Sequence, residues 1–176
     1  MKTLNLGCGT VKIKGAVNVD CNPGVKPDLV FDIGRQFPLE DEVFEEVYFF
    51  HCIEHIEKHN QPNVLKEIHR VMVLGGILYL SYPEFEHIIR NWLDNAKNDR
   101  KFWEATIYGR QHYKGDYHFS GMVSLDLEEL LSNVGFQVID RFPEPNQEFN
   151  TVMKARRVAA TPTYEEVLHR EIFQCR

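Results

Sequence analysis

The residues most suited to binding a ligand are a glycine-rich turn and two aspartates that follow it in the chain. Gly7, Cys8 and Gly9 come directly after a short apolar run, and glycine allows the backbone to turn sharply and to approach a ligand closely. Asp20 ends the second apolar run and Asp32 ends the third. Carboxylates at such strand ends can accept hydrogen bonds from ribose hydroxyls or from an adenine amino group. The ordered set therefore predicts a site for a nucleoside-like ligand.

The elements that must position these residues are predicted from the apolar patterning. Short apolar or β-branched runs bounded by Gly, Pro, Asp or Asn are typical of strands, and the continuously apolar central runs indicate a largely parallel sheet that is buried on both faces. Apolar stripes at helical spacing lie between them, which together indicate an α/β layered fold. The predicted strands cover residues 4–6, 16–19, 29–31, 47–50, 77–82, 136–139 and 150–153, and the predicted helices cover residues 63–72, 84–95 and 124–134.

Two of the predicted helices carry signals at their ends. The helix over 63–72 has Pro62 in its first turn and Gly75 just past its end. For the helix over 124–134, Ser124 is predicted to be the N-cap, and Gly135 is predicted to end the helix.

Composition limits the classes of protein to which the chain can belong. Its 176 residues are 43% apolar and 26% charged, which suits one globular domain over residues 1–176. The net charge of −6 disfavours general nucleic-acid binding. The longest apolar run, residues 71–82, is shorter than the roughly 20 residues of a membrane span. With no signal-peptide pattern and four widely spaced cysteines, we expect a cytoplasmic protein.

Taken in order, the motifs resemble those of the class I S-adenosylmethionine-dependent methyltransferases. The motifs are LNLGCG at 4–9, NVD at 18–20, DLVFDI at 28–33, HCIEHI at 51–56, LKEIHRVM at 65–72 and GGILYL at 75–80. The resemblance covers residues 3 to 157, and within that superfamily the chain is most similar to small methyltransferase-domain proteins associated with glycan or polysaccharide pathways. It implies a Rossmann-like sheet that is mostly parallel, with an antiparallel last strand.

The resemblance also implies which residues bind S-adenosylmethionine. The backbone of Gly7, Cys8 and Gly9 would carry the methionine portion of this cofactor. Asp20 would hold the ribose hydroxyls. The remaining implied contacts are Cys21, Asp32 and Ile33 at the adenine, and Phe50 and His51 near the sulfonium.

The chain departs from the family pattern near its start. Residues 10–15 alone separate the glycine turn from the second strand, so the usual first crossover helix is expected to be shortened or missing. No helical extension precedes the first strand, and such an extension covers the substrate in many relatives. We therefore expect an open site, which a homodimer or the tail at 162–176, predicted to be a short helix, could help to cover.

The histidines offer a competing interpretation as a metal site. His51, His55 and His59 are four residues apart, so one continuous helix would carry them on one face, with Cys52 or Glu54 as a further ligand. The spacing differs from H-E-x-x-H, and His51 is predicted to end a strand, which would break the shared face. The sequence therefore predicts no metal site, with His55 and His59 at a helix start and on the surface.

Residues 97–119 are predicted to form a substrate-recognition insertion. The segment carries five Lys or Arg against three acids, and its aromatic residues are Phe102, Trp103, Tyr108, Tyr113, Tyr117 and Phe119. Aromatic rings beside polar groups suit a sugar or another polyhydroxyl acceptor. A competing interpretation is a surface excursion whose aromatic rings cover an exposed sheet edge.

Methyl transfer to a hydroxyl is an in-line displacement that benefits from alignment and from a base that titrates near neutral pH. Histidine is the natural candidate for that base. We expect it to be His118, with His112 and His51 as the other candidates, and we expect Tyr113 or Tyr117 to orient the acceptor.

The resulting prediction is S-adenosylmethionine-dependent methyl transfer to a small-molecule or glycan-linked acceptor. The alternative is a non-catalytic module that binds S-adenosylmethionine or S-adenosylhomocysteine as a sensor or scaffold. A nicotinamide-dependent oxidoreductase is opposed by Lys12, which stands where the G-x-G-x-x-G fingerprint needs its third glycine.

Overall fold

The computed structural model describes residues 2–95, 100–112, 115–145 and 149–158. These form a seven-stranded sheet with the order β3-β2-β1-β4-β5-β7-β6. Strands β1 to β5 are parallel to their neighbours, while β7 is antiparallel to both β5 and β6. The strands are β1 (Thr3–Leu6), β2 (Val17–Asp20), β3 (Leu29–Val30), β4 (Phe44–Phe50), β5 (Met72–Pro83), β6 (Phe136–Pro143) and β7 (Asn150–Arg157). The predicted mostly parallel sheet and antiparallel last strand are confirmed.

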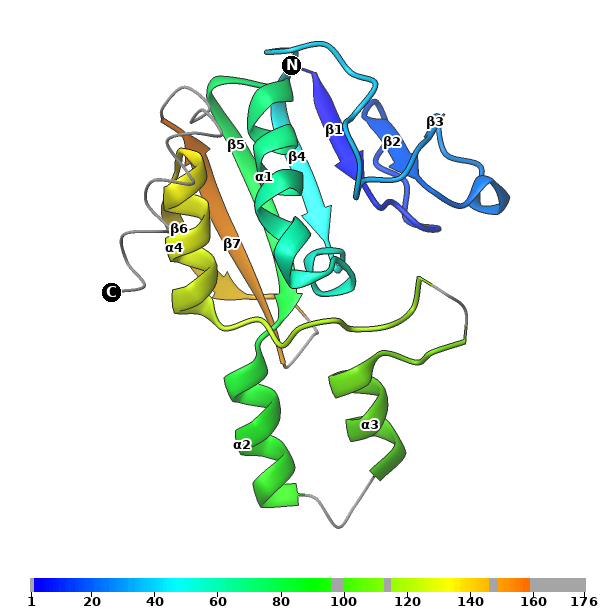
Figure 1. Cartoon of the computed structure of the whole chain (residues 1–176), viewed down its shortest axis with the longest axis vertical. Helices are drawn as coiled ribbons and strands as arrows, with labels where there is room; N and C mark the ends of the chain where they lie inside the picture. The colour runs from blue at the N-terminus through cyan, green and yellow to red at the C-terminus, as the bar shows by residue number, and fades with distance from the viewer. Residues whose placement is uncertain (1, 96–99, 113–114, 146–148, 159–176) are drawn as a thin grey trace.

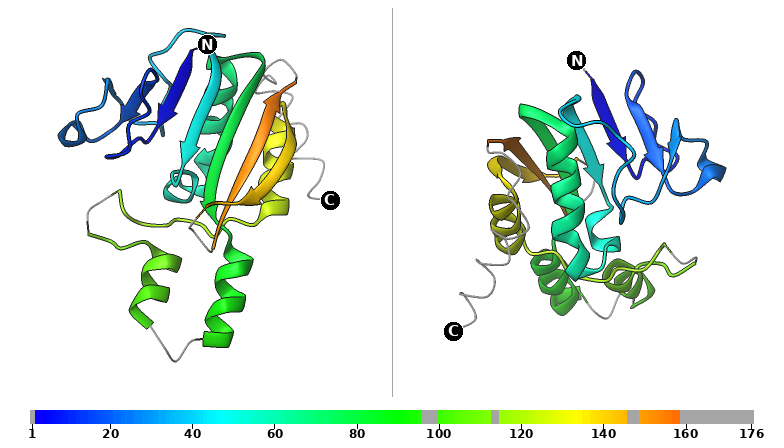
Figure 2. Two further views of the ribbon diagram at one scale, coloured as in Figure 1. Left: turned by 180° about the vertical axis from the view of Figure 1, so that it is seen from behind. Right: turned by 45° about the horizontal axis from the view of Figure 1, so that its top comes forward.

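The helices are distributed unevenly about the sheet. α1 (Gln61–Val71) and α4 (Ser124–Val134) cover one face, as Figure 1 shows. Seen from behind, in the left view of Figure 2, the other face carries no helix from the described residues. α2 (Phe85–Asn95) and α3 (Arg100–Tyr108) lie beyond the ends of β4 and β5. Helical cover is therefore one-sided.

The loss of the first crossover helix is confirmed. Residues 7–16, between β1 and β2, contain no helix, and the link from β2 to β3 contains only the 3₁₀ turn η1 (Pro23–Val25). On the face that the helices do not cover, the rings of Tyr48 and Tyr79 stack with their centroids 4.9 Å apart. Lys154 lies over the Tyr79 ring.

The core lies between the sheet and the two covering helices. Leu65 and Ile68 of α1 and Leu131 of α4 are fully buried against strand residues such as Phe49 and Leu80. This is the packing that the apolar stripes of both helices predict.

Two predicted helix ends are wrong in detail. The N-cap of α4 is Val123, and Ser124 is its first helical residue. α1 passes directly into β5 at Met72, so Gly75 lies inside that strand. Gly135 does end α4, in the left-handed conformation. The Ser124 prediction fails because Glu84, forty residues away, supplies the capping carboxylate.

The predicted insertion contains α3 and a following loop. Residues 97–99, 113 and 114 of the insertion, which include Tyr113, lie outside the described residues, and so does the tail at 162–176. Among the described residues, no helix combines the length and the apolar character that a membrane crossing requires.

Candidate functional site

The glycine turn after β1 adopts a conformation that suits glycine. Gly7 and Gly9 have φ angles of 63° and 49°. A Cβ added to Gly7 would lie 2.1 Å from Sγ of Cys52, which follows β4. A Cβ on Gly9 would meet nothing within 4 Å. The turn thus packs against the end of β4 at Gly7 and leaves open space at Gly9, where a ligand can approach the backbone.

Asp20 fixes the end of β2 beside this turn. Its Oδ2 accepts a hydrogen bond from the amide of Gly9 at 2.8 Å, and its Oδ1 accepts one from the amide of Asn22 at 2.8 Å. The side chain is half-buried. Each carboxylate oxygen retains a lone pair, so the group can accept further bonds from a ligand.

The other predicted cofactor residues lie at the neighbouring strand ends. Cys21 is an exposed residue beside Asp20. Partial burial of its thiol, together with the charge of Asp20, raises the pKa of that thiol. Asp32 is exposed after β3, where its Oδ1 accepts a hydrogen bond from the amide of Gly34. Ile33 is half-buried against the core.

His51 ends β4 and is held by acidic side chains. Its φ of 52° is unusual for a residue other than glycine. Its Nε2 lies 2.9 Å from Oε2 of Glu144, which also accepts a hydrogen bond from the Ser81 hydroxyl. Burial lowers the pKa of His51, but hydrogen bonds and charge from Glu54 and Glu144 outweigh it and raise that pKa overall. The raised pKa favours the protonated form of the His51 ring.

Glu54 and His55 follow on the 3₁₀ turn η2 (Ile53–His55). Glu54 is 2% exposed, and its Oε1 lies 3.8 Å from Nδ1 of His51. Its Oε2 is buried and has no hydrogen-bond partner among the described residues. Nδ1 of His55 donates a hydrogen bond to the carbonyl of Tyr117 at 2.9 Å.

His118 reaches the same place from the loop after α3. The His118 amide donates to the carbonyl of Tyr108, and the Phe119 amide donates to the carbonyl of Glu54 at 2.8 Å. The first bond ties this loop, described at residues 109–112 and 115–119, to the end of α3, and the second ties it to η2. The His118 and His55 rings meet edge to face, with centroids 4.8 Å apart. Burial lowers the pKa of His118, so its neutral form is favoured.

These groups line a cavity of about 380 Å³ that we call the acceptor cavity. Its walls come from the residue after β4, from η2, the end of β5, α3, the segment after α3 and the start of β7. Cys52, on which Gly7 packs, is the next residue after His51 in the chain, and His51 lines the cavity. The lining residues are His51, Glu54, His55, Pro83, Phe102, Ala105, Thr106, Gly109, Arg110, Asp116, His118 and Asn150.

Two of the predicted catalytic residues lie outside the acceptor cavity. His112 is exposed and lines a separate hollow of about 570 Å³ with Lys101 and Tyr108. The Tyr117 side chain is 41% exposed, and its backbone carbonyl binds His55. Of the predicted bases, only His118 and His51 face the cavity.

Sequence reasoning gave little weight to several groups that line or support the cavity. Glu54 was considered only as an accessory ligand, although it stands between two histidines in the HCIEHI run. Glu144 supports His51 from 93 residues away, and no local pattern marks it. Arg110 and Asp116 lie in the predicted insertion, whose mixture of charge and aromatic residues was the usable signal.

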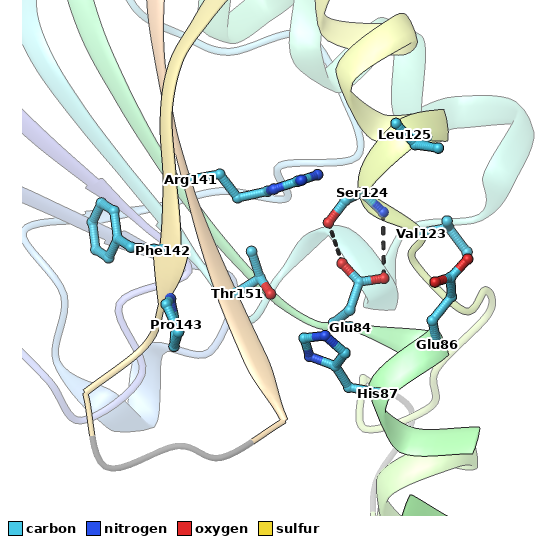
Figure 3. A pocket seen from close by; sticks show the side chains of 10 residues that line it. All are labelled: Glu84, Glu86, His87, Val123, Ser124, Leu125, Arg141, Phe142, Pro143 and Thr151. Carbon is cyan, nitrogen blue, oxygen red and sulfur yellow. Dashed lines mark hydrogen bonds between the residues drawn. The ribbon is translucent and has the colours of Figure 1, made fainter. Parts of the chain in front are cut away.

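A second hollow of about 400 Å³ lies between α2, α4 and the ends of β6 and β7. Figure 3 shows Glu84 directed at the start of α4, with Arg141 reaching in from β6. Both carboxylate oxygens of Glu84 accept hydrogen bonds from Ser124, one from its amide and one from its hydroxyl. The Tyr82 hydroxyl also bonds to Ser124, at 2.8 Å. Both oxygens of this buried carboxylate therefore have a partner within the fold.

Comparison with known proteins relates part of the chain to methyltransferases. Residues 13–80 match a family model described as a methyltransferase domain. The match covers 68 of the 176 residues and indicates an S-adenosylmethionine-dependent methyltransferase. The match starts just after the glycine turn and includes Asp20, Asp32 and the whole of η2.

Solved methyltransferase structures share the fold. A SAM-dependent methyltransferase from Methanosarcina mazei has a TM-score of 0.69 at 16% identity, covering 90% of this chain and 93% of the other. The 1,6-didemethyltoxoflavin-N1-methyltransferase of Burkholderia thailandensis, with bound S-adenosylhomocysteine, has a TM-score of 0.61 at 17% identity, covering 90% and 71%. No curated protein matches the chain. The comparisons do not support the narrower resemblance to proteins of glycan pathways.

The methyl donor of this methyltransferase is S-adenosylmethionine. The open space at Gly9 and the spare acceptor capacity of Asp20 fit such a ligand, because it presents ribose hydroxyls as donors and an extended chain that can lie along the backbone.

Proposed function

We propose that this methyltransferase methylates a small-molecule or glycan-linked acceptor bound in the acceptor cavity. The observation that carries the proposal is the contact of Gly7 with Cys52, which joins the cofactor turn to the segment after β4 that bears His51 and Glu54. A cavity of about 380 Å³ suits a small polar group better than a folded macromolecule.

In this proposal, residues at the ends of the first three strands hold the cofactor. The Asp20 carboxylate accepts the ribose hydroxyls, and the backbone at Gly7, Cys8 and Gly9 supports the methionine portion. The adenine lies by Cys21, Asp32 and Ile33. When bound, S-adenosylmethionine supplies a methyl group that is already activated on a sulfonium, so the protein contributes mainly alignment.

His118 is the proposed base for a hydroxyl acceptor. The acceptor oxygen forms its bond to the methyl carbon while the carbon–sulfur bond breaks and leaves its electron pair on sulfur. The hydroxyl proton passes to the free ring nitrogen of His118. Burial of His118 supports this role, because it favours the neutral ring that can accept the proton. His51 is less suited, since Glu54 and Glu144 favour its protonated form.

The first test is a calorimetric titration of the whole chain with S-adenosylmethionine and S-adenosylhomocysteine. Asp20→Ala should weaken binding at least tenfold, while Asp140→Ala, which changes an exposed aspartate on β6, should leave it unchanged. Circular dichroism checks that both variants are folded. An intact chain that binds neither ligand would contradict the assignment.

The second test screens small polar acceptors with radiolabelled S-adenosylmethionine. Once an acceptor is found, His118→Ala should lower kcat by about 10²–10⁴-fold and leave the cofactor Kd unchanged. His112→Ala is the matched control, because this histidine lies outside the acceptor cavity. Equal losses in both variants would argue against His118 as the base.

A further inference from the structure

Three side chains that can bind a metal converge inside the acceptor cavity. Glu54 and His55 come from η2, and His118 comes from the loop that crosses it. One ligand atom from each lies within 4.8 Å of the other two. Donor atoms that share an ion at about 2.1 Å stand about 3–4 Å apart. Small side-chain rotations would therefore bring all three to one ion.

The second observation is the buried oxygen of Glu54. The side chain is 2% exposed, and its Oε2 has no hydrogen-bond partner among the residues that the structure describes. A buried polar atom left without a partner costs about 1–3 kcal/mol, and more when it is charged. Glu54 lines the cavity together with His55 and His118, so a cation bound among the three side chains would supply this carboxylate with a partner.

The hydrogen bonding of the histidines also suits metal binding. Nδ1 of His55 donates to the Tyr117 carbonyl, which leaves the lone pair of Nε2 free. Histidine ligands in metal sites commonly donate their other ring nitrogen to a backbone carbonyl in this way, which fixes the ring orientation. The His118 ring lies edge to face against the His55 ring, with centroids 4.8 Å apart, so the two imidazoles share one side of the cavity.

We propose that Glu54, His55 and His118 bind a divalent first-row transition ion in the acceptor cavity. Two imidazoles and one carboxylate suit Zn²⁺, Mn²⁺, Fe²⁺ or Co²⁺, whereas Mg²⁺ and Ca²⁺ prefer oxygen ligands. Three protein ligands leave coordination positions open, as in metal sites that bind substrate. Of the three histidines that are four residues apart in the sequence, His55 is the one proposed as a ligand. His59 is exposed and pairs with Glu57 on the surface.

The use of this ion in methylation rests on the proposed function. An acceptor hydroxyl bound at an open position loses its proton to solvent more readily, because the cation stabilises the oxygen anion. That oxygen then forms the bond to the methyl carbon, and the carbon–sulfur electron pair goes to sulfur. With the ion bound, the lone pair of His118 coordinates the metal and the proton goes to solvent, so proton transfer to His118 applies to the metal-free chain alone.

The test is a titration of the whole chain after dialysis against a chelator, without cofactor or acceptor. Co²⁺ is followed by its visible absorption and Zn²⁺ by calorimetry. We expect one equivalent to bind, a Co²⁺ spectrum that Zn²⁺ displaces, and no displacement by millimolar Mg²⁺. Glu54→Gln and His118→Ala should each weaken binding at least 100-fold.

The matched control is His59→Ala, which removes an exposed histidine of the HCIEHIEKH run and should leave binding unchanged. Binding of S-adenosylhomocysteine reports that each variant is folded, since the cofactor residues are separate. Absence of binding to the intact chain would overturn the proposal, as would binding that survives both substitutions. Neither result would affect the cofactor titration, so a failure here is distinct from a failure of the proposed function.

Discussion

Glu54 and Glu84 follow neighbouring parallel strands, β4 and β5, and both side chains are almost completely buried, with 2% and 4% exposure. Their hydrogen bonding differs. Glu84 accepts bonds on both oxygens from the first residue of α4, which stabilises the exposed amide end of a helix (Figure 3). Glu54 has a distant histidine on one oxygen and no partner on the other among the described residues.

This difference distinguishes a carboxylate whose partners are supplied by the fold from the proposed metal ligand. A buried charge whose bonds are all made by the fold contributes to stability, and its removal leaves donors without acceptors. A buried carboxylate with an oxygen that accepts no hydrogen bond lowers the stability of the fold, and a bound ligand can supply the missing partner. The four predictions below test this contrast.

The largest expected effect is stabilisation by metal. At Zn²⁺ concentrations about 100 times Kd, the intact chain should gain about 2.7 kcal/mol, or a rise in Tm of roughly 5–10 °C. Glu54→Gln should abolish this shift and Glu84→Gln should retain it. Thermal unfolding with and without chelator measures both. A shift that is lost only in Glu84→Gln would reverse the assignment of the two glutamates.

The second prediction concerns the cap. Glu84→Ala should lower the free energy of unfolding by about 1–3 kcal/mol, because the Ser124 amide and hydroxyl lose their acceptor. Urea unfolding monitored by circular dichroism measures the loss. Glu86→Ala is the control, since that side chain is exposed on α2. A loss below about 0.5 kcal/mol would mean that water replaces the carboxylate.

The third prediction concerns the loop that carries His118. Gly109 has a φ of 78°, and a Cβ there would lie 2.0 Å from the Asp116 carbonyl. Gly109→Ala should therefore displace the loop and weaken Co²⁺ binding about tenfold, or about 1.4 kcal/mol. Gly15→Ala is the matched control, with a similar φ of 84° but no neighbour within 4 Å. Co²⁺ titration compares the two, and equal affinities would mean that the loop does not position a ligand.

The smallest expected effect is that of Glu54→Gln on the metal-free chain. Its free energy of unfolding should change by less than about 0.5 kcal/mol, because the lost interaction with His51 is offset by removal of a buried charge with an unsatisfied oxygen. Urea unfolding in chelator measures it beside Glu84→Ala. A loss as large as that of Glu84→Ala would show that Glu54 is structural.

The sequence predicted most of the sheet and the position of the glycine turn, because both depend on local patterns. Seven apolar runs became seven strands, and Asp20 stands at the end of β2 as expected. The shortened link from Thr10 to Gly15 was evident from its length alone. Predictions of helix ends were weaker, since Glu84 caps α4 from a distant part of the chain.

The acceptor cavity was only partly predictable. His118 was selected from its place in an unusual insertion, but His112 and Tyr117 were selected on the same grounds and lie outside the cavity. Residue type and neighbourhood along the chain do not distinguish these three. Their positions depend on hydrogen bonds between the loop and η2, which join residues more than fifty positions apart.

The amino-acid sequence by itself determined the order of strands and helices along the chain, the glycine turn and the acids after the first strands, because side-chain periodicity and turn chemistry act over a few residues. Only the tertiary structure decided which buried carboxylate is satisfied and which is not. That outcome depends on which donors tertiary packing brings within hydrogen-bond distance: Ser124 reaches Glu84 from forty residues away, whereas no donor of the described residues reaches Oε2 of Glu54.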